Sequence, residues 1–117
     1  MRITGKVVAV DFDGTITVEN NYPRIGKIDD EAVRVLKELE ANGNHLFLYT
    51  CRQGRELSAA LEVLAEYGLD MQTASPYDYS VAAGRKPIAD YYIDDRAFAS
   101  CGIDMDWRRI EESLCLE

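Results

Sequence analysis

Two aspartates separated by one residue follow an apolar run near the N-terminus. Residues 7–15 read VVAVDFDGT, so Asp11 and Asp13 come directly after four small or β-branched apolar residues. Carboxylates in such a pair can attack phosphorus as nucleophiles, transfer protons, or hold a divalent cation. Because carboxylates crowded at one place repel each other, they favour a bound cation between them. The pair therefore marks a candidate catalytic or metal site.

Further reactive side chains stand at the ends of two other apolar runs. HLFLYT (45–50) ends on Thr50 and is followed by Cys51 and Arg52. YYIDD (91–95) ends on Asp94 and Asp95, with Arg96 next, and Lys86 precedes it in a Gly-Arg-Lys-Pro segment. In open α/β sheets, ligands bind outside the carboxyl ends of the strands. If these runs are parallel strands, one edge of the sheet collects carboxylates, a hydroxyl and several cations.

The hydrophobic periodicity predicts such a sheet. Continuous apolar runs are typical of buried parallel strands, whereas apolar residues three and four apart indicate amphipathic helices. These patterns alternate, which favours a three-layer α/β/α Rossmann-like domain with a mainly parallel central sheet. We predict strands over 6–10, 45–50 and 90–94, a weaker strand over 70–75, and helices over 30–43, 55–68 and the tail 104–116.

The helix boundaries and one irregular segment have local signals. Asp29 or Asp30 can cap the helix over 30–43, and Gly43 can lie just past its end. Residues 14–28 interrupt the alternation, because Gly, Asn-Asn, Pro and Gly occur there among β-forming residues. We therefore predict a loop or small hairpin that projects from the end of the first strand.

Length and composition indicate a single soluble domain. The chain has 117 residues, of which 47% are hydrophobic and 29% charged, so we expect one domain over 1–117. The N-terminus lacks a signal-peptide pattern, no stretch reaches the roughly 18 apolar residues of a membrane span, and the three cysteines have no CxxC spacing. We expect a cytoplasmic protein with free thiols that does not associate with membranes.

The net charge restricts the class of ligand. A formal charge of −8 disfavours a nucleic-acid partner, which requires a basic surface. A small phosphorylated substrate fits only if a local cation offsets the carboxylates. Mg²⁺ is the expected cofactor, because it takes a few protein oxygens and completes its shell with water and phosphate.

The four elements together resemble the haloacid dehalogenase-like (HAD) phosphohydrolase superfamily. VVAVDFDGT is similar to its first motif, an apolar strand followed by Asp-x-Asp-x-Thr, and HLFLYT, GRKP and YYIDD follow in the expected order. The match spans residues 7–95. Too few residues separate these motifs for an inserted cap domain, so the resemblance is to a small, uncapped member. With no cap, substrate selection falls to residues 16–26 or to a neighbouring copy in a homo-oligomer.

The resemblance implies a Mg²⁺-dependent phosphatase that hydrolyses a phosphomonoester through an aspartyl-phosphate. It assigns Asp11 as the nucleophile and Asp13 as the general acid and base. It also assigns Asp94 and Asp95 to the metal, together with Asp11 and the Asp13 carbonyl, and leaves open which of Asp94 and Asp95 binds it directly.

The resemblance implies supporting roles for other residues. Thr50 donates a hydrogen bond to the phosphoryl group, and Lys86 neutralises its charge. We expect Thr15, Arg52 and Arg96 to contact the substrate; for the two arginines the alternative is a solvated surface charge.

Proteins of three other functional classes share some of these features. A response-regulator receiver domain is disfavoured, because HLFLYT lacks a phosphoacceptor aspartate and the Lys-Pro pair precedes the last acidic pair. IDDR with a downstream WRR is similar to polynucleotide 3′-phosphatases, although the net charge argues against that substrate. A catalytically silent protein that binds phosphorylated ligands is a further alternative. Among enzymes, the dehalogenase and phosphonatase branches of the superfamily are alternatives, but an Asp at position 13 favours phosphoester hydrolysis, because an alkoxide leaving group needs a proton.

Overall fold

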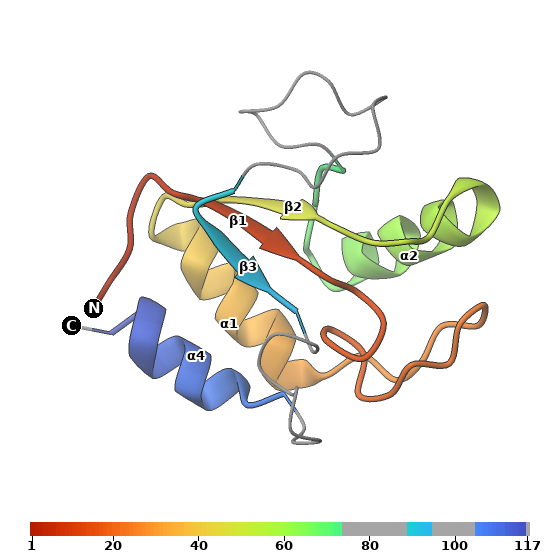
Figure 1. Ribbon diagram of the computed structural model, residues 1–117, viewed down its shortest axis with the longest axis horizontal. Coiled ribbons are helices and arrows are strands. Elements are labelled where there is room, and N and C mark those ends of the chain that lie inside the picture. The colour runs from red at the N-terminus through yellow and green to blue at the C-terminus, as the bar shows by residue number, and fades with distance from the viewer. Residues whose placement is uncertain (74–88, 95–104, 117) are drawn as a thin grey trace.

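The structure is a computed structural model that describes residues 1–73, 89–94 and 105–116. Its elements, in chain order, are β1 (Val7–Val10), α1 (Asp30–Ala41), β2 (His45–Leu48), α2 (Gly54–Glu66), β3 (Tyr91–Ile93) and α4 (Trp107–Leu114). Figure 1 shows α1 and α4 side by side against the sheet, with the N-terminal segment close to the end of α4, where Ile3 N donates to Leu114 O at 2.9 Å. Strands and helices thus occur where the periodicity predicts them.

Within the described residues the sheet has three parallel strands in the order β2-β1-β3. Val8 of β1 aligns with Leu46 of β2 and with Tyr91 of β3, so β1 is paired on both sides. The weaker strand predicted over 70–75 is limited, among the described residues, to one parallel bridge between Gln72 and Phe47. The parallel sheet is confirmed, and all three strands end at the same edge.

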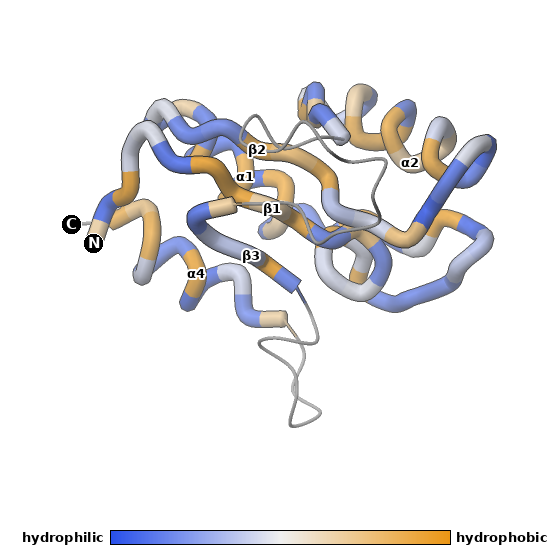
Figure 2. The backbone as a smooth tube through the Cα atoms, turned by 45° about the horizontal axis from the view of Figure 1, so that its top comes forward, coloured by the Kyte–Doolittle hydropathy of each residue, from blue (hydrophilic) through white to orange (hydrophobic). Residues whose placement is uncertain are grey.

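Alternate residues of β1 enter two hydrophobic clusters, as expected for a strand buried on both faces. Val8 and Val10 join the large cluster, to which α1, α2 and α4 all contribute buried side chains. Val7 and Ala9 pack with Phe47 in a smaller cluster on the other face. Figure 2 shows hydrophobic stretches along β1 and β2. The described helices share one cluster, so a second helical layer stays a prediction.

Side-chain caps fix the start of α1 and of α4. Asp29 is the N-cap of α1 and accepts a hydrogen bond from Glu31 N at 2.9 Å, while Gly43 follows the helix with φ 91°. Asp106 caps α4 by accepting from Arg109 N at 3.1 Å. Both ends of α1 are therefore where the sequence predicts them.

Buried Asn44 joins three segments at the edge of the sheet opposite the strand ends. Its Oδ1 accepts from Lys6 N at 3.1 Å, and its Nδ2 donates to the carbonyls of Ile3 and Leu39 at 3.0 and 2.9 Å. These bonds fix where β1 begins relative to α1 and β2. In the described part of the chain, no helix has the length and apolar character of a membrane span.

Candidate active site

Asp11 and Asp94 follow neighbouring strands and lie at the same edge of the sheet. The backbone N of Asp11 donates to the carbonyl of Ile93 at 3.0 Å, which continues the pairing of β1 with β3 by one residue. On the other side of β1, Tyr49 N donates to Val10 O at 2.8 Å. The sheet therefore holds the backbone of Asp11 on both sides of its strand and brings Asp94 next to it.

A tight turn after Asp11 carries Asp13. The carbonyl of Phe12 accepts hydrogen bonds from the backbone N of Thr15, Ile16 and Thr17, at 3.2, 2.9 and 3.1 Å. Gly14 has φ 78°, a conformation that glycine adopts without steric cost. Residues 18–27 then project as a loop closed by an antiparallel bridge between Thr17 and Ile28, in agreement with the loop or small hairpin predicted there.

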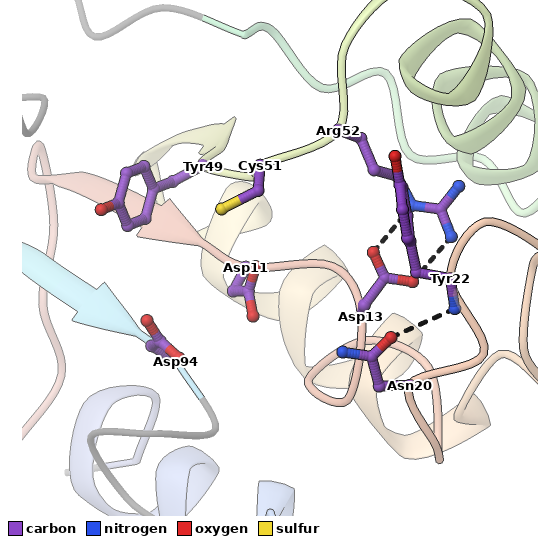
Figure 3. Close-up of a pocket in the computed structure, with 8 residues that line it drawn as sticks. All are labelled: Asp11, Asp13, Asn20, Tyr22, Tyr49, Cys51, Arg52 and Asp94. Atoms are coloured by element: carbon purple, nitrogen blue, oxygen red, sulfur yellow. Dashed lines mark hydrogen bonds and ion pairs between the residues drawn. The ribbon is translucent and has the colours of Figure 1, made fainter. Parts of the chain in front are cut away.

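The strand ends and this loop enclose a pocket of about 570 Å³. Figure 3 shows its lining, which combines carboxylates, two tyrosines, a thiol and one guanidinium: Asp11, Asp13, Asn20, Tyr22, Tyr49, Cys51, Arg52 and Asp94. Three carboxylates against one guanidinium leave the described lining negatively charged. An anionic substrate would need additional positive charge there.

Arg52 forms a two-point ion pair with Asp13. Its Nε donates to Asp13 Oδ2 and its Nη2 to Asp13 Oδ1, both at 2.7 Å (Figure 3). Arg52 is 2% exposed, so water screens this pair little. The hydrogen bond with Asp13 raises the pKa of Arg52 above its ordinary value.

The same guanidinium holds the loop. Its Nη2 donates to Arg24 O at 2.8 Å, and its Nη1 donates to the carbonyls of Pro23 and Glu56 at 3.2 and 3.3 Å. The rings of Phe12 and Tyr22 lie 5.2 and 5.1 Å from its central carbon, within cation–π range. A guanidinium has five N–H donors, and these bonds use all five within the chain. Arg52 therefore lines the pocket but has no N–H group left to donate to a phosphate. The sequence, in contrast, predicts that Arg52 contacts the substrate.

The two threonines of the predicted site differ in position. Thr15 is 1% exposed, and its hydroxyl donates to Asp11 Oδ2 at 3.4 Å, so it contacts the predicted nucleophile. Thr50 is half-buried at the end of β2, where its Oγ1 accepts from Arg52 N at 3.1 Å. The Thr50 hydroxyl still carries a hydrogen that can be donated to a phosphoryl group.

The predicted metal ligands fit Mg²⁺ in chemistry. Among the described residues, no group of three His, Cys, Asp or Glu side chains is placed to hold a metal. Asp11 and Asp94 nevertheless line the same pocket, and Mg²⁺ is usually bound through one or two carboxylates with water and phosphate completing its shell. Lys86, Asp95 and Arg96 lie outside the described residues, so their predicted roles stay predictions.

Several lining residues were not among the predicted site residues. Asn20 and Tyr22 come from the loop that was expected to select substrates, whereas Tyr49 and Cys51 flank Thr50. Trp107 reaches the site from α4, because its Nε1 donates to Thr15 O at 3.0 Å. The flanking positions could be inferred from HLFLYT, but the bond from Trp107 spans most of the chain and has no local signal.

A solved structure of a conserved protein from Bacteroides thetaiotaomicron is similar to this fold. The two chains are 39% identical and superpose with a TM-score of 0.76, over 92% of this chain and 87% of that one. The chain belongs to the same family as that conserved protein. No protein-family model matches the sequence, and no curated protein matches it either. The likeness covers nearly the whole chain and gives no activity.

Proposed function

We propose that the protein is a Mg²⁺-dependent phosphatase that hydrolyses a small phosphomonoester. The observation that carries this proposal is the position of Asp11 and Asp94, which follow adjacent parallel strands and line one pocket with Asp13. Carboxylates from separate strand ends around one cavity suit phosphoryl transfer, in which positioning and charge neutralisation supply most of the catalysis. The resemblance of VVAVDFDGT, HLFLYT, GRKP and YYIDD to HAD phosphohydrolases supports the same reaction.

In the first half-reaction, Asp11 attacks phosphorus. A bond forms between its carboxylate oxygen and phosphorus while the bond to the leaving oxygen breaks, giving an aspartyl-phosphate. Asp13 donates a proton to the leaving oxygen. In the second half-reaction, Asp13 takes a proton from the water that attacks the aspartyl-phosphate, the bond between phosphorus and the Asp11 oxygen breaks, and inorganic phosphate leaves with the Asp11 carboxylate restored. Thr50 donates a hydrogen bond to the phosphoryl oxygens, and Lys86 offsets their charge.

Asp11 and Asp94 would hold the Mg²⁺, with Asp95 and the Asp13 carbonyl as further donors. When bound, the ion would supply the positive charge that the negatively charged lining lacks and would neutralise charge on the phosphoryl oxygens. The buried hydroxyl of Thr15 donates a hydrogen bond to Asp11 Oδ2 and so helps to orient the nucleophile.

We further propose that residues 1–117 form one uncapped, three-layer Rossmann-like HAD domain that acts in the cytoplasm. The hairpin loop 18–27 is the part of the pocket wall that can select the leaving group, because Asn20 and Tyr22 both line the pocket. The loop is mostly hydrophilic (Figure 2). Polar and sugar-like leaving groups therefore match this wall better than long apolar ones.

A phosphatase screen tests the function. Sugar phosphates, nucleotides and 3′-phosphorylated oligonucleotides are each assayed with Mg²⁺ and with EDTA. We expect turnover of a small phosphomonoester that EDTA abolishes and that Asp11→Asn lowers at least about a thousandfold. Asp30→Asn, which alters an exposed carboxylate at the start of α1, is the matched control and should retain activity.

Three outcomes would contradict the proposal. Turnover that persists in EDTA or in Asp11→Asn excludes the mechanism. Turnover of 3′-phosphorylated oligonucleotides and of no small phosphomonoester would show that the protein is a polynucleotide 3′-phosphatase. Binding of phosphorylated compounds without any turnover would show a catalytically silent binding protein.

A further inference from the structure

The pairing of Arg52 with Asp13 is more constrained than a surface ion pair. Two parallel N–H···O bonds of 2.7 Å fix both the distance and the plane of the Asp13 carboxylate. The Arg52 side chain is 1% exposed and that of Asp13 is 11% exposed. A carboxylate held in this way keeps one orientation, whereas an exposed aspartate on a turn samples several.

Arg52 is the fixed member of the pair. Three backbone carbonyls accept from its guanidinium, and the rings of Phe12 and Tyr22 lie on it. Turning Arg52 away would leave three backbone carbonyls without this donor, so the guanidinium has one favoured position. Asp13 therefore takes its orientation from Arg52.

The pairing leaves Asp13 lone pairs that can take up the proton that it must carry as a general acid. Its two oxygens offer about four lone-pair sites, and the guanidinium occupies two of them. Asp13 also lines the pocket next to Asp11 and Asp94. A general acid must lie within hydrogen-bond reach of the leaving oxygen, so fixing its carboxylate plane reduces the ordering that each turnover requires.

We propose that Arg52 is a positioning residue for the acid–base chemistry of Asp13 and does not bind the substrate. This inference rests on the proposed phosphatase function. Lysine cannot replace Arg52 in this role, because an ammonium group lacks the planar fork that makes the two parallel bonds. The same guanidinium binds the carbonyls of Pro23 and Arg24, so the orientation of the acid and the position of the loop depend on one side chain.

The test compares two substrates with different leaving groups. Phenyl phosphate needs a proton on its leaving oxygen, whereas 4-nitrophenyl phosphate departs as a stable anion. Asp13→Asn should therefore lower kcat for phenyl phosphate at least about tenfold more than for 4-nitrophenyl phosphate. If Arg52 positions Asp13, Arg52→Lys shows the same preferential loss in kcat, with little change in KM. The double variant with Asp13→Asn and Arg52→Lys should then discriminate between the two substrates no more than Asp13→Asn alone.

Arg55→Lys is the matched control, because Arg55 is an exposed arginine on α2 close in sequence to Arg52. Thermal unfolding establishes that each variant is folded. A second measurement uses the wild-type protein alone: a crystal structure with Mg²⁺ and orthovanadate should keep both bonds from Arg52 to Asp13. This structure decides the question if Arg52→Lys does not fold.

The outcomes separate the two proposals. An equal loss on both substrates, or a rise in KM with kcat unchanged, would show that Arg52 stabilises the fold or binds the substrate, and the positioning role would be wrong. Release of Asp13 from Arg52 in the vanadate complex would also exclude it. If the wild-type protein hydrolysed neither substrate, nor any phosphomonoester in the wider screen, the phosphatase function itself would fail and the positioning role with it.

Discussion

The indole Nε1 of Trp107 donates a hydrogen bond to the carbonyl of Thr15 at 3.0 Å, which attaches the last helix to the turn that follows Asp13. Trp107 is 1% exposed and belongs to the large hydrophobic cluster. One side chain therefore packs the core and also supports the candidate active site.

Replacing Trp107 should affect stability and activity together. Trp107→Phe keeps a buried ring but leaves the Thr15 carbonyl without its donor, which costs about 1–3 kcal/mol of unfolding free energy. We expect this loss in urea unfolding and a lower kcat, because Thr15 contacts Asp11. Arg108→Gln changes an exposed residue of the same helix and should leave both quantities unchanged. An unaltered stability of Trp107→Phe would contradict the role of the bond.

Gly26 allows two parts of the hairpin to approach closely. A Cβ at this position would lie 2.7 Å from the backbone oxygen of Glu19, so the loop must shift to accept it. Gly26→Ala should cost about 1–3 kcal/mol and raise KM, because the loop carries Asn20 and Tyr22 into the pocket. Unfolding measurements and steady-state kinetics check both effects.

Gly5→Ala is the control for Gly26→Ala. Its added methyl meets no atom within 4 Å, and its φ of 64° adds only local backbone strain ahead of β1. This control should lower stability without changing KM. A normal KM in Gly26→Ala would show that the loop does not contact the substrate.

Asp94 should set the Mg²⁺ requirement of the proposed phosphatase activity. Asp94→Asn removes one negative charge from the pocket and should raise the Mg²⁺ concentration for half-maximal activity about tenfold or more. Activity is titrated with Mg²⁺ for both proteins, with Asp70→Asn as an exposed control. An unchanged titration midpoint would exclude Asp94 as a metal ligand.

Cys115 should make stability depend on pH in the alkaline range. Burial raises the pKa of its thiol from 9.0 to about 11, with a further contribution from Glu38 and Glu111. Between these values the unfolded chain loses a proton that the folded chain keeps, so the free energy of unfolding falls as the pH rises. The stabilisation that depends on the protonated thiol is fully present below the pKa of the unfolded state. It is lost once the pH rises through the pKa of the folded state.

Urea unfolding of wild type and Cys115→Ala at pH values of about 8 and about 11 measures this dependence. The wild type should lose on the order of 2 kcal/mol more than the variant between the two conditions, since each pKa unit is worth about 1.4 kcal/mol. Parallel losses in both proteins would mean that the thiol is not protected from ionisation.

The sequence predicts the elements of this fold because their signals are local. The apolar run of β1 and the Asp29 cap of α1 each depend on a few adjacent residues, and the structure has both. The convergence of Asp11 and Asp94 follows from a general rule, that parallel strands end at one edge of a sheet. Local patterns and one topological rule therefore suffice to place the core of the site.

The partner of Arg52 could not be predicted in the same way. Its bonds to Asp13 span 39 positions, and no periodicity or motif indicates which of several nearby charges a guanidinium binds. The orientation depends on the path of the hairpin loop, which brings the carbonyls of Pro23 and Arg24 to the same group. The position of Arg52 after a strand end predicts a substrate contact, but it gives no sign of the bonds from Arg52 to Asp13 and to the hairpin loop.

The attachment of the hairpin to Arg52 has an evolutionary consequence. The guanidinium binds the loop mainly through main-chain oxygens at Pro23 and Arg24, which are present whatever side chains the loop carries. The side chain at Asn20 can thus change while the loop stays anchored at the candidate site, whereas Tyr22 also packs against the guanidinium. A scaffold of this kind can acquire new ligand specificities by single substitutions in the loop, with Asp11, Asp13 and Asp94 unchanged.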